Sequence, residues 1–251
     1  MGDDAAMRPR SVLRILAAVA LVTAVAVPSA SPIAAASSRE YRLDLLEPGD
    51  FVTQHTDVTC VGASVQTMLN IVRGGADTTR ATQRTAQRTA QRMSNPVYVR
   101  RSGGASARGW AYALERLGGG PYRVRAYGSR TAALNAVAEA IRTTSRPAGL
   151  LVWGGAHAWV ASGFRATADP AAQTRFRIAS LVVSDPWWPR PAGSHGATMP
   201  PGTELTPAAL GRHFVLFQRG PRRGGSALNG SFVVVLPVDP AAVAEKAALL
   251  R

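Results

Sequence analysis

Apolar residues recur at helical spacing in the first half of the chain. From Cys60 onwards they fall at i, i+4, i+7, i+8 and i+11, which predicts a helix with one face towards a core (Val61, Val65, Met68, Leu69 and Val72). Asp57 or Thr59 can cap the start of this helix, and Gly74 can end it. Two further segments are predicted to be helical on the same grounds (residues 108–117 and 131–143).

The pattern changes from residue 148, where short apolar runs alternate with glycine, proline and aspartate. These runs predict strands (residues 150–153, 157–164, 176–184, 214–217 and 232–236). Thr206-Pro207 suits the start of a short helix, and Asp239-Pro240 the start of a final one. Because helices come first and strands follow, we predict an α+β fold in which an N-terminal helical part packs on an antiparallel β-sheet.

Residues 1–36 have the three regions of a secretory signal peptide. A basic region, an apolar run and a small-residue cleavage site follow one another (Arg8 to Arg14, residues 15–27, and Ala34-Ala35-Ala36). The apolar run is shorter than the ~20 residues of a membrane-spanning helix. We therefore expect a secreted or cell-envelope protein with no stable membrane insertion after cleavage, and a single domain over residues 37–251. An uncleaved membrane anchor is the alternative.

Composition and charge narrow the class of protein. With 46% hydrophobic and 18% charged residues, the chain lacks the composition of a disordered protein. The net charge of +14 comes almost entirely from arginine, which recurs at every fourth position of residues 80–92 and would line one helix face. This stretch is either a solvated helix, a mobile insertion, or a surface with weak attraction to anionic cell-surface polymers. No nucleic-acid-binding motif accompanies it, so we expect no specific nucleic acid partner.

Cys60 is the only cysteine in the chain, so an internal disulfide is excluded. A lone cysteine is either a buried apolar side chain, an intermolecular link or a reactive thiol. Its place at the start of a predicted helix favours the reactive thiol, because unpaired N–H groups stabilise a thiolate there. The histidines show no short ligand spacing to Cys60, so we expect no metal and no cofactor.

His157 and Asp185 are brought together if the strand from His157 turns back near residue 171. The register that places Phe164 opposite Ile178 also places His157 opposite Asp185, with Cβ atoms about 5 Å apart. The carboxylate would then orient the imidazole, which would take the proton of the Cys60 thiol. Taken singly, a core histidine and a turn-forming aspartate are the simpler interpretations.

Three more residues complete the candidate site. Gln54 precedes the cysteine, and its amide could donate to an oxyanion together with the Cys60 N–H. Trp159 and Trp187 lie close in sequence to His157 and Asp185 and could line a substrate cleft, although core packing is the alternative for tryptophans.

These motifs, in the order Gln, Cys, His, Asp, resemble those of the papain-like cysteine peptidases (Gln54, Cys60-Val61-Gly62-Ala63-Ser64, Gly154-Gly155-Ala156-His157-Ala158-Trp159-Val160 and Val182-Val183-Ser184-Asp185-Pro186). The nearest branch is similar to the bacteriocin-processing, double-glycine-leader peptidases and their stand-alone secreted relatives. The resemblance covers about residues 51–236. Many members have glycine directly after the cysteine, where this chain has Val61, and the arginine-rich stretch is unusual; both leave substrate access open.

The resemblance implies a papain-like fold and a cysteine peptidase acting on a peptide or protein substrate. It assigns Gln54 to the oxyanion hole, Cys60 as nucleophile, His157 as base and Asp185 as orienting residue. Two other classes of protein stay open: a catalytically inactive binding module on the same scaffold, and a basic surface-binding protein with a structural thiol.

Overall fold

A computed structural model describes residues 40–191, 198–218, 227–239 and 241 of the chain. The signal-like segment lies outside the described residues, as does the helix expected from residue 239 except for residues 239 and 241. The strands and helices belong to one compact unit. Along the part of the chain that is described, no helix is both long and apolar enough to cross a membrane.

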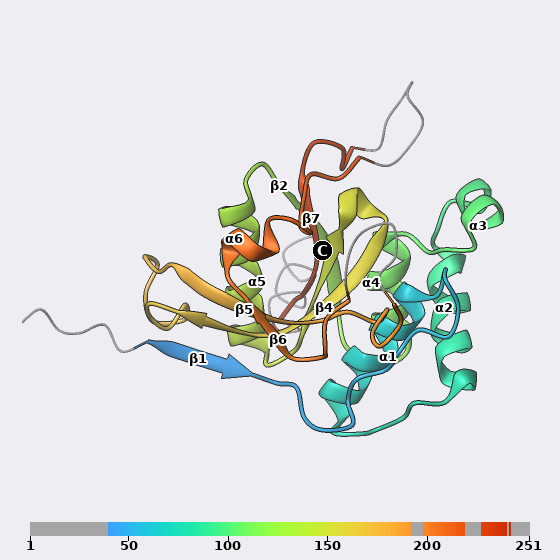
Figure 1. Cartoon of the computed structure of the whole chain (residues 1–251), viewed down its shortest axis with the longest axis horizontal. Helices are drawn as coiled ribbons and strands as arrows, with labels where there is room; N and C mark the ends of the chain where they lie inside the picture. The colour runs from blue at the N-terminus through green and yellow to red at the C-terminus, as the bar shows by residue number, and fades with distance from the viewer. Residues whose placement is uncertain (1–39, 192–197, 219–226, 240, 242–251) are drawn as a thin grey trace, which may run out of the picture. The chain divides into compact units, whose positions relative to one another are not determined.

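The centre of the fold is an antiparallel seven-stranded sheet (Figure 1). The strand order is β2-β7-β3-β4-β5-β6, and β1 pairs with a further part of β4. The strand bounds are β1 Tyr41–Asp44, β2 Tyr122–Tyr127, β3 Ala148–Val152, β4 His157–Ala166, β5 Ile178–Ser184, β6 Thr203–Leu205 and β7 Phe232–Pro237. The predicted α+β class is therefore confirmed.

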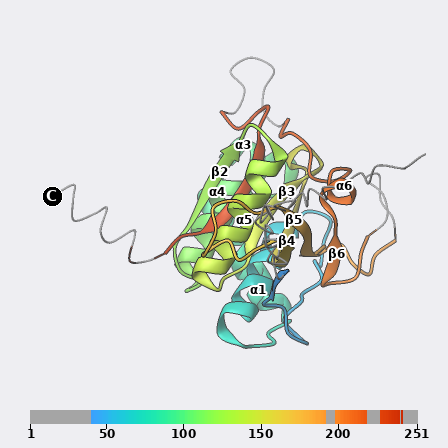
Figure 2. The same cartoon turned by 90° about the vertical axis from the view of Figure 1, so that its left-hand side faces the viewer.

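Helices cover both faces of this sheet (Figures 1 and 2). They are α1 Cys60–Arg73, α2 Arg80–Arg92, α3 Pro96–Ser102, α4 Ala107–Arg116, α5 Arg130–Thr144 and α6 Pro207–Leu210. Along β4, Ala158 and Val160 join the core beneath α1 and α4, whereas Trp159 and Ala161 join the core beneath α5. This alternation follows from the two-residue period of a strand. The helical part is thus divided between two faces rather than packed on one.

The helix α1 begins at Cys60, as predicted. Its buried stripe is the expected one, except that Val72 is only partly buried (Val61, Val65, Met68 and Leu69 are buried). Gly74 ends the helix in the left-handed conformation at φ 63°, which glycine adopts without steric cost.

The arginine-rich stretch forms α2, an ordered helix packed against α1 and α4. Its arginines are exposed, while Ala86 and Ala90 are buried in the core. The mobile-insertion interpretation is therefore wrong, and the helical one is confirmed. A side-chain cap at Thr79, which accepts from the N–H of Thr82, fixes where the helix starts.

One predicted strand is absent, and three observed strands were not predicted. Residues 214–217 form no strand, because Phe214 is buried after α6 while Val215 and Leu216 are exposed, so the run does not alternate between two faces. The short strands β1, β2 and β6 were not predicted. These strands contain many polar residues, such as Arg123 and Arg125 in β2, so they do not form apolar runs. Polar residues are tolerated in β2 because it lies at the edge of the sheet.

Candidate active site

The imidazole of His157 and the carboxylate of Asp185 are in direct contact. His157 is the first residue of β4 and pairs with Val152 of β3, while Asp185 directly follows β5. His157 Nε2 lies 2.7 Å from Asp185 Oδ1, and the two side chains are only 6% and 0% exposed. A buried contact of this length fixes the orientation of the imidazole ring.

The strand register that led us to expect this contact is wrong. Phe164 faces Leu181 rather than Ile178, and irregularities at Ala161/Gly163 and Arg165/Ala166 shift the pairing of β4 with β5. Asp185 instead reaches the ring from beyond the last residue of its strand. The backbone N–H of Trp187 donates to Asp185 Oδ1 at 2.8 Å, which holds the carboxylate in place as the chain turns.

Cys60 also interacts with the imidazole of His157. It is the first residue of α1 and is partly exposed. Burial alone would lower the pKa of His157, but hydrogen bonds with Asp185 and Cys60, together with their charges, raise it to about 9. Because Nε2 is engaged by Asp185, Nδ1 is the ring nitrogen left for the thiol. Thiol, imidazole and carboxylate therefore form one continuous chain of contacts.

Gln54 is buried and tied to the loop that carries Asp185. Its backbone N–H donates to the carbonyl of Pro186 at 2.8 Å, and its side-chain Nε2 donates to the carbonyl of Thr56 at 2.7 Å. A carboxamide nitrogen carries two hydrogens, so one N–H is left for a ligand. Among the described residues, Gln54 Oε1 has no hydrogen-bond partner.

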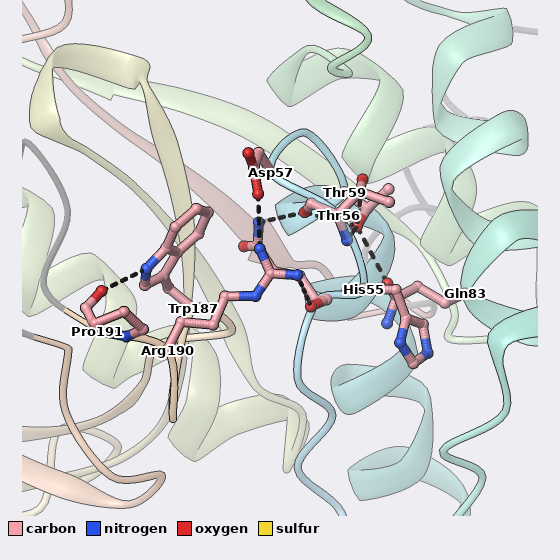
Figure 3. A network of polar contacts seen from close by, with 9 residues as sticks. His55, Thr56, Asp57, Thr59, Gln83, Trp187, Arg190 and Pro191 are labelled. Atoms are coloured by element: carbon pink, nitrogen blue, oxygen red, sulfur yellow. Dashed lines mark hydrogen bonds and ion pairs between the residues drawn. The ribbon is translucent and has the colours of Figure 1, made fainter.

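Arg190 joins the Gln54 loop to the Asp185 loop (Figure 3). Its Nη1 lies 2.7 Å from Asp57 Oδ1, and its Nη2 donates to the carbonyl of Gln54 at 3.1 Å. The guanidinium also lies 4.9 Å from the ring centroid of Trp187, whose Nε1 donates to Pro191. One side chain thus spans the two loops on which the site is built.

The two predicted substrate-binding tryptophans differ in position. Trp187 is partly buried, and its ring meets His157 edge-on at a centroid distance of 6.5 Å. Trp159 is fully buried in the core beneath α5 and cannot line a cleft. The cleft prediction for Trp159 is therefore wrong, because the core beneath α5 covers this side chain completely.

Trp153 stacks on His157, a contact that the sequence did not predict. The two rings are 4.8 Å apart and inclined by only 11°. Trp153 has a positive φ of 52° beside Gly154 and Gly155, and its Nε1 donates to His213 Nδ1 at 3.2 Å. Burial, with the nearby positive charge of Arg212, lowers the pKa of His213, which keeps Nδ1 able to accept. The Trp-Gly-Gly run before His157 was the available signal.

The described part of the chain contains no group of His, Cys, Asp and Glu side chains that could hold a metal ion. Comparisons with known protein families, with curated proteins and with solved structures found no match to this chain.

Proposed function

We propose that this chain is a secreted, papain-like cysteine peptidase that hydrolyses a peptide or related amide bond. One observation carries the proposal: Cys60, His157 and Asp185, which are far apart in sequence, meet in one chain of contacts whose thiol is partly exposed. The α+β fold with a cysteine at the start of its first helix supports the same assignment. Signal-directed export is part of the proposal.

In the first step, the Cys60 thiolate attacks the substrate carbonyl and forms the S–C bond of a tetrahedral intermediate. Collapse of this intermediate breaks the C–N bond, while Nδ1–H of the His157 imidazolium protonates the departing amine. The raised pKa of His157, about 9, means that the imidazolium is present at neutral pH. The proton is therefore in place before substrate arrives.

In the second step, water attacks the resulting thioester, and neutral His157 takes one proton from that water. Breaking of the C–S bond releases the acid and restores the thiolate–imidazolium pair. Asp185 accepts from Nε2 throughout, which keeps Nδ1 directed at the reaction and stabilises the charged ring. Trp153, stacked on the ring, restricts its rotation.

Charge on the carbonyl oxygen needs donors that are already in place. The free Nε2 hydrogen of Gln54 and the backbone N–H of Cys60 fit this role, because the first N–H groups of a helix have no partner inside it. The bond between Gln54 Nε2 and Thr56 fixes the direction of the carboxamide before substrate binds.

A peptide-library digestion tests the proposed function directly. The purified mature chain is incubated with a diverse peptide mixture, and new termini are identified by mass spectrometry. We expect cleavage by the wild-type protein and none by Cys60→Ala, whose fold is checked by circular dichroism. A folded wild-type protein that yields no new termini in peptides, isopeptides and peptidoglycan fragments would contradict the proposal.

A further inference from the structure

The inner face of α2 carries a glutamine at every fourth position, directly before each of three arginines (Gln83, Gln87 and Gln91 precede Arg84, Arg88 and Arg92). The arginines are exposed, whereas Gln83 and Gln87 are only 1% and 5% exposed. A carboxamide loses its bonds to water when it is buried, so each needs protein partners. Those partners lie in the loop that leads to Cys60, in the first turn of α1 and at Gly103.

Gln83 binds this loop at three points, and Figure 3 shows its position beside His55 and Thr59. Its Oε1 accepts from the backbone N–H of His55 at 2.8 Å and from Thr59 Oγ1 at 3.2 Å. Its Nε2 donates to the carbonyl of Thr53 at 3.0 Å. One carboxamide is therefore hydrogen-bonded to the residues on both sides of Gln54 and to the residue before Cys60.

Gln87 caps α1 from outside the helix. Its Oε1 accepts from the N–H of Gly62 at 2.9 Å, and its Nε2 donates to the carbonyls of Val58 at 3.2 Å and Gly103 at 3.1 Å. The side chain of Thr59, at the cap position, makes no cap bond. The first-turn N–H of Gly62 therefore depends on Gln87 for a partner.

Gly62 makes this approach possible. A Cβ at that position would lie 2.9 Å from the carbonyl oxygen of Gln83 and 3.0 Å from Cβ of Gln87, closer than such atoms pack. Because Gly62 has no Cβ, the backbone of α2 can approach the start of α1 closely. The two helices are thus in contact at the turn that presents Cys60.

We infer that Gln83 and Gln87 are positioning residues that hold Gln54 and Cys60 in place for the reaction. The inference rests on the proposed function. Their side-chain bonds go to the loop before Cys60, the first turn of α1 and Gly103, and none goes to His157 or Asp185. The carboxamides are neutral, so they fix the loop without adding a charge beside the thiolate–imidazolium pair.

Gln83→Met and Gln87→Met test this role, because methionine preserves the volume and removes the hydrogen bonds. Gln91→Met is the matched control, since Gln91 lies on the same face and donates only to Gly103; Arg88→Gln controls for the outer face. A displacement of about 1 Å in a reacting group lowers the rate by up to about 100-fold. We expect kcat to fall between about 10- and 100-fold in the two test variants, with KM changing less and the control variants near wild type.

Two readouts separate positioning from a general loss of structure. Because Gln83 acts through the loop of Gln54, Gln83→Met should cost little in a Gln54→Ala background, whereas independent effects would add. The upper limb of the pH profile should stay near 9, since the His157 contacts are untouched. Full additivity with Gln54→Ala, or kcat unchanged in both Met variants, would overturn the inference.

Amide hydrogen exchange over residues 54–62 gives a test that needs no hydrolysis. Faster exchange there in Gln83→Met and Gln87→Met, but not in Gln91→Met, is expected, because Gly62 and His55 lose their acceptors. If the wild-type protein cleaves nothing, the proposed function fails. Unchanged exchange in both Met variants would separately overturn the inference that Gln83 and Gln87 hold the loop and the first turn of α1. Should the Met variants not fold, Gln83→Asn and Gln87→Asn, one methylene too short, carry the same expectations.

Discussion

The two halves of the candidate site are held by different kinds of structure. His157 and Asp185 sit at the ends of adjacent strands, buried and fixed by the sheet and its core. Gln54 and Cys60 sit on an irregular loop and a helix start, held mainly by side chains reaching over from α2 and from Arg190. Changes in the sheet half should therefore alter the protonation of His157. Changes in the loop half should instead alter the positions of Gln54 and Cys60.

His157→Ala should have the largest effect. It removes the proton carrier from the sheet half, and loss of one member of such a triad costs about 10⁴-fold or more in kcat. The measurement is steady-state hydrolysis of the best peptide from the library, with thermal unfolding as the check on folding. Retention of more than about a tenth of the activity would exclude His157 as base.

Gln54→Ala should have the next largest effect, in the loop half. Removal of one oxyanion donor lowers kcat about 10²- to 10³-fold. KM should change little, because the donor acts on charge that develops in the transition state. Gln54→Glu serves as a second variant, since it keeps the size of the side chain but presents a carboxylate to the oxyanion. A rise in KM with kcat unchanged would contradict the oxyanion role.

Asp185→Asn should change the pH profile more than the rate at neutral pH. The amide oxygen still accepts from Nε2, so we expect a loss of about tenfold or less, as papain-like enzymes with Asn in this role remain active. Without the carboxylate charge, the upper limb should move from about pH 9 towards the ordinary histidine value of 6.5. An unmoved upper limb would mean that Asp185 does not set the protonation of His157.

The same shift predicts a pH dependence of stability. The pKa of His157 is raised to about 9 in the folded state from 6.5, so the folded state binds the proton more tightly. The resulting stabilisation is complete below about pH 6.5 and is lost as the pH rises through about 9. Urea unfolding at several pH values should show this loss in the wild type but not in His157→Ala.

Arg190→Ala should give the smallest effect. Its partner Asp57 is 81% exposed at the side chain, and such ion pairs contribute about 1 kcal/mol or less to stability. Arg190 also donates to the carbonyl of Gln54, so its loss should let the Gln54 loop shift. We therefore expect kcat to fall by about threefold to tenfold as well. Asp57→Asn is the control, which weakens the ion pair and leaves the Gln54 contact; equal effects in both would argue against that contact.

Helices α1, α4 and α5 could be predicted because their apolar residues recur at helical spacing. The central strands are buried on both faces, so they were predicted from short apolar runs and not from alternation. Helix α3 was not predicted. The contact of His157 with Asp185 was also predictable, although from a wrong register, since the irregularities in β4 and β5 leave no sequence signal. Phe214 was misassigned to a strand because one buried aromatic in an apolar run does not distinguish a strand from a turn.

The supports of the loop half were less visible in the sequence. The repeat in α2 drew attention to its arginines, whereas the glutamines one residue earlier carry the contacts. The face of a polar helix that becomes buried depends on the helix packed against it. In the sequence, Gly62 was the sign that another helix packs closely on the start of α1. The stacking of Trp153 on His157 was not predicted, because Trp153 adopts a positive φ that the sequence does not announce.

Alkylation of Cys60 by iodoacetamide across pH tests the central claim most directly, because the chain has no other cysteine to react. If Cys60 and His157 form an ion pair, the wild-type rate should be high and nearly constant through neutral pH and change near pH 9, where His157 loses its proton. The His157→Ala rate should instead rise with the ionisation of an ordinary thiol, near pH 8.5 as an approximate value. Identical profiles for the two proteins, both following an ordinary thiol, would contradict the account.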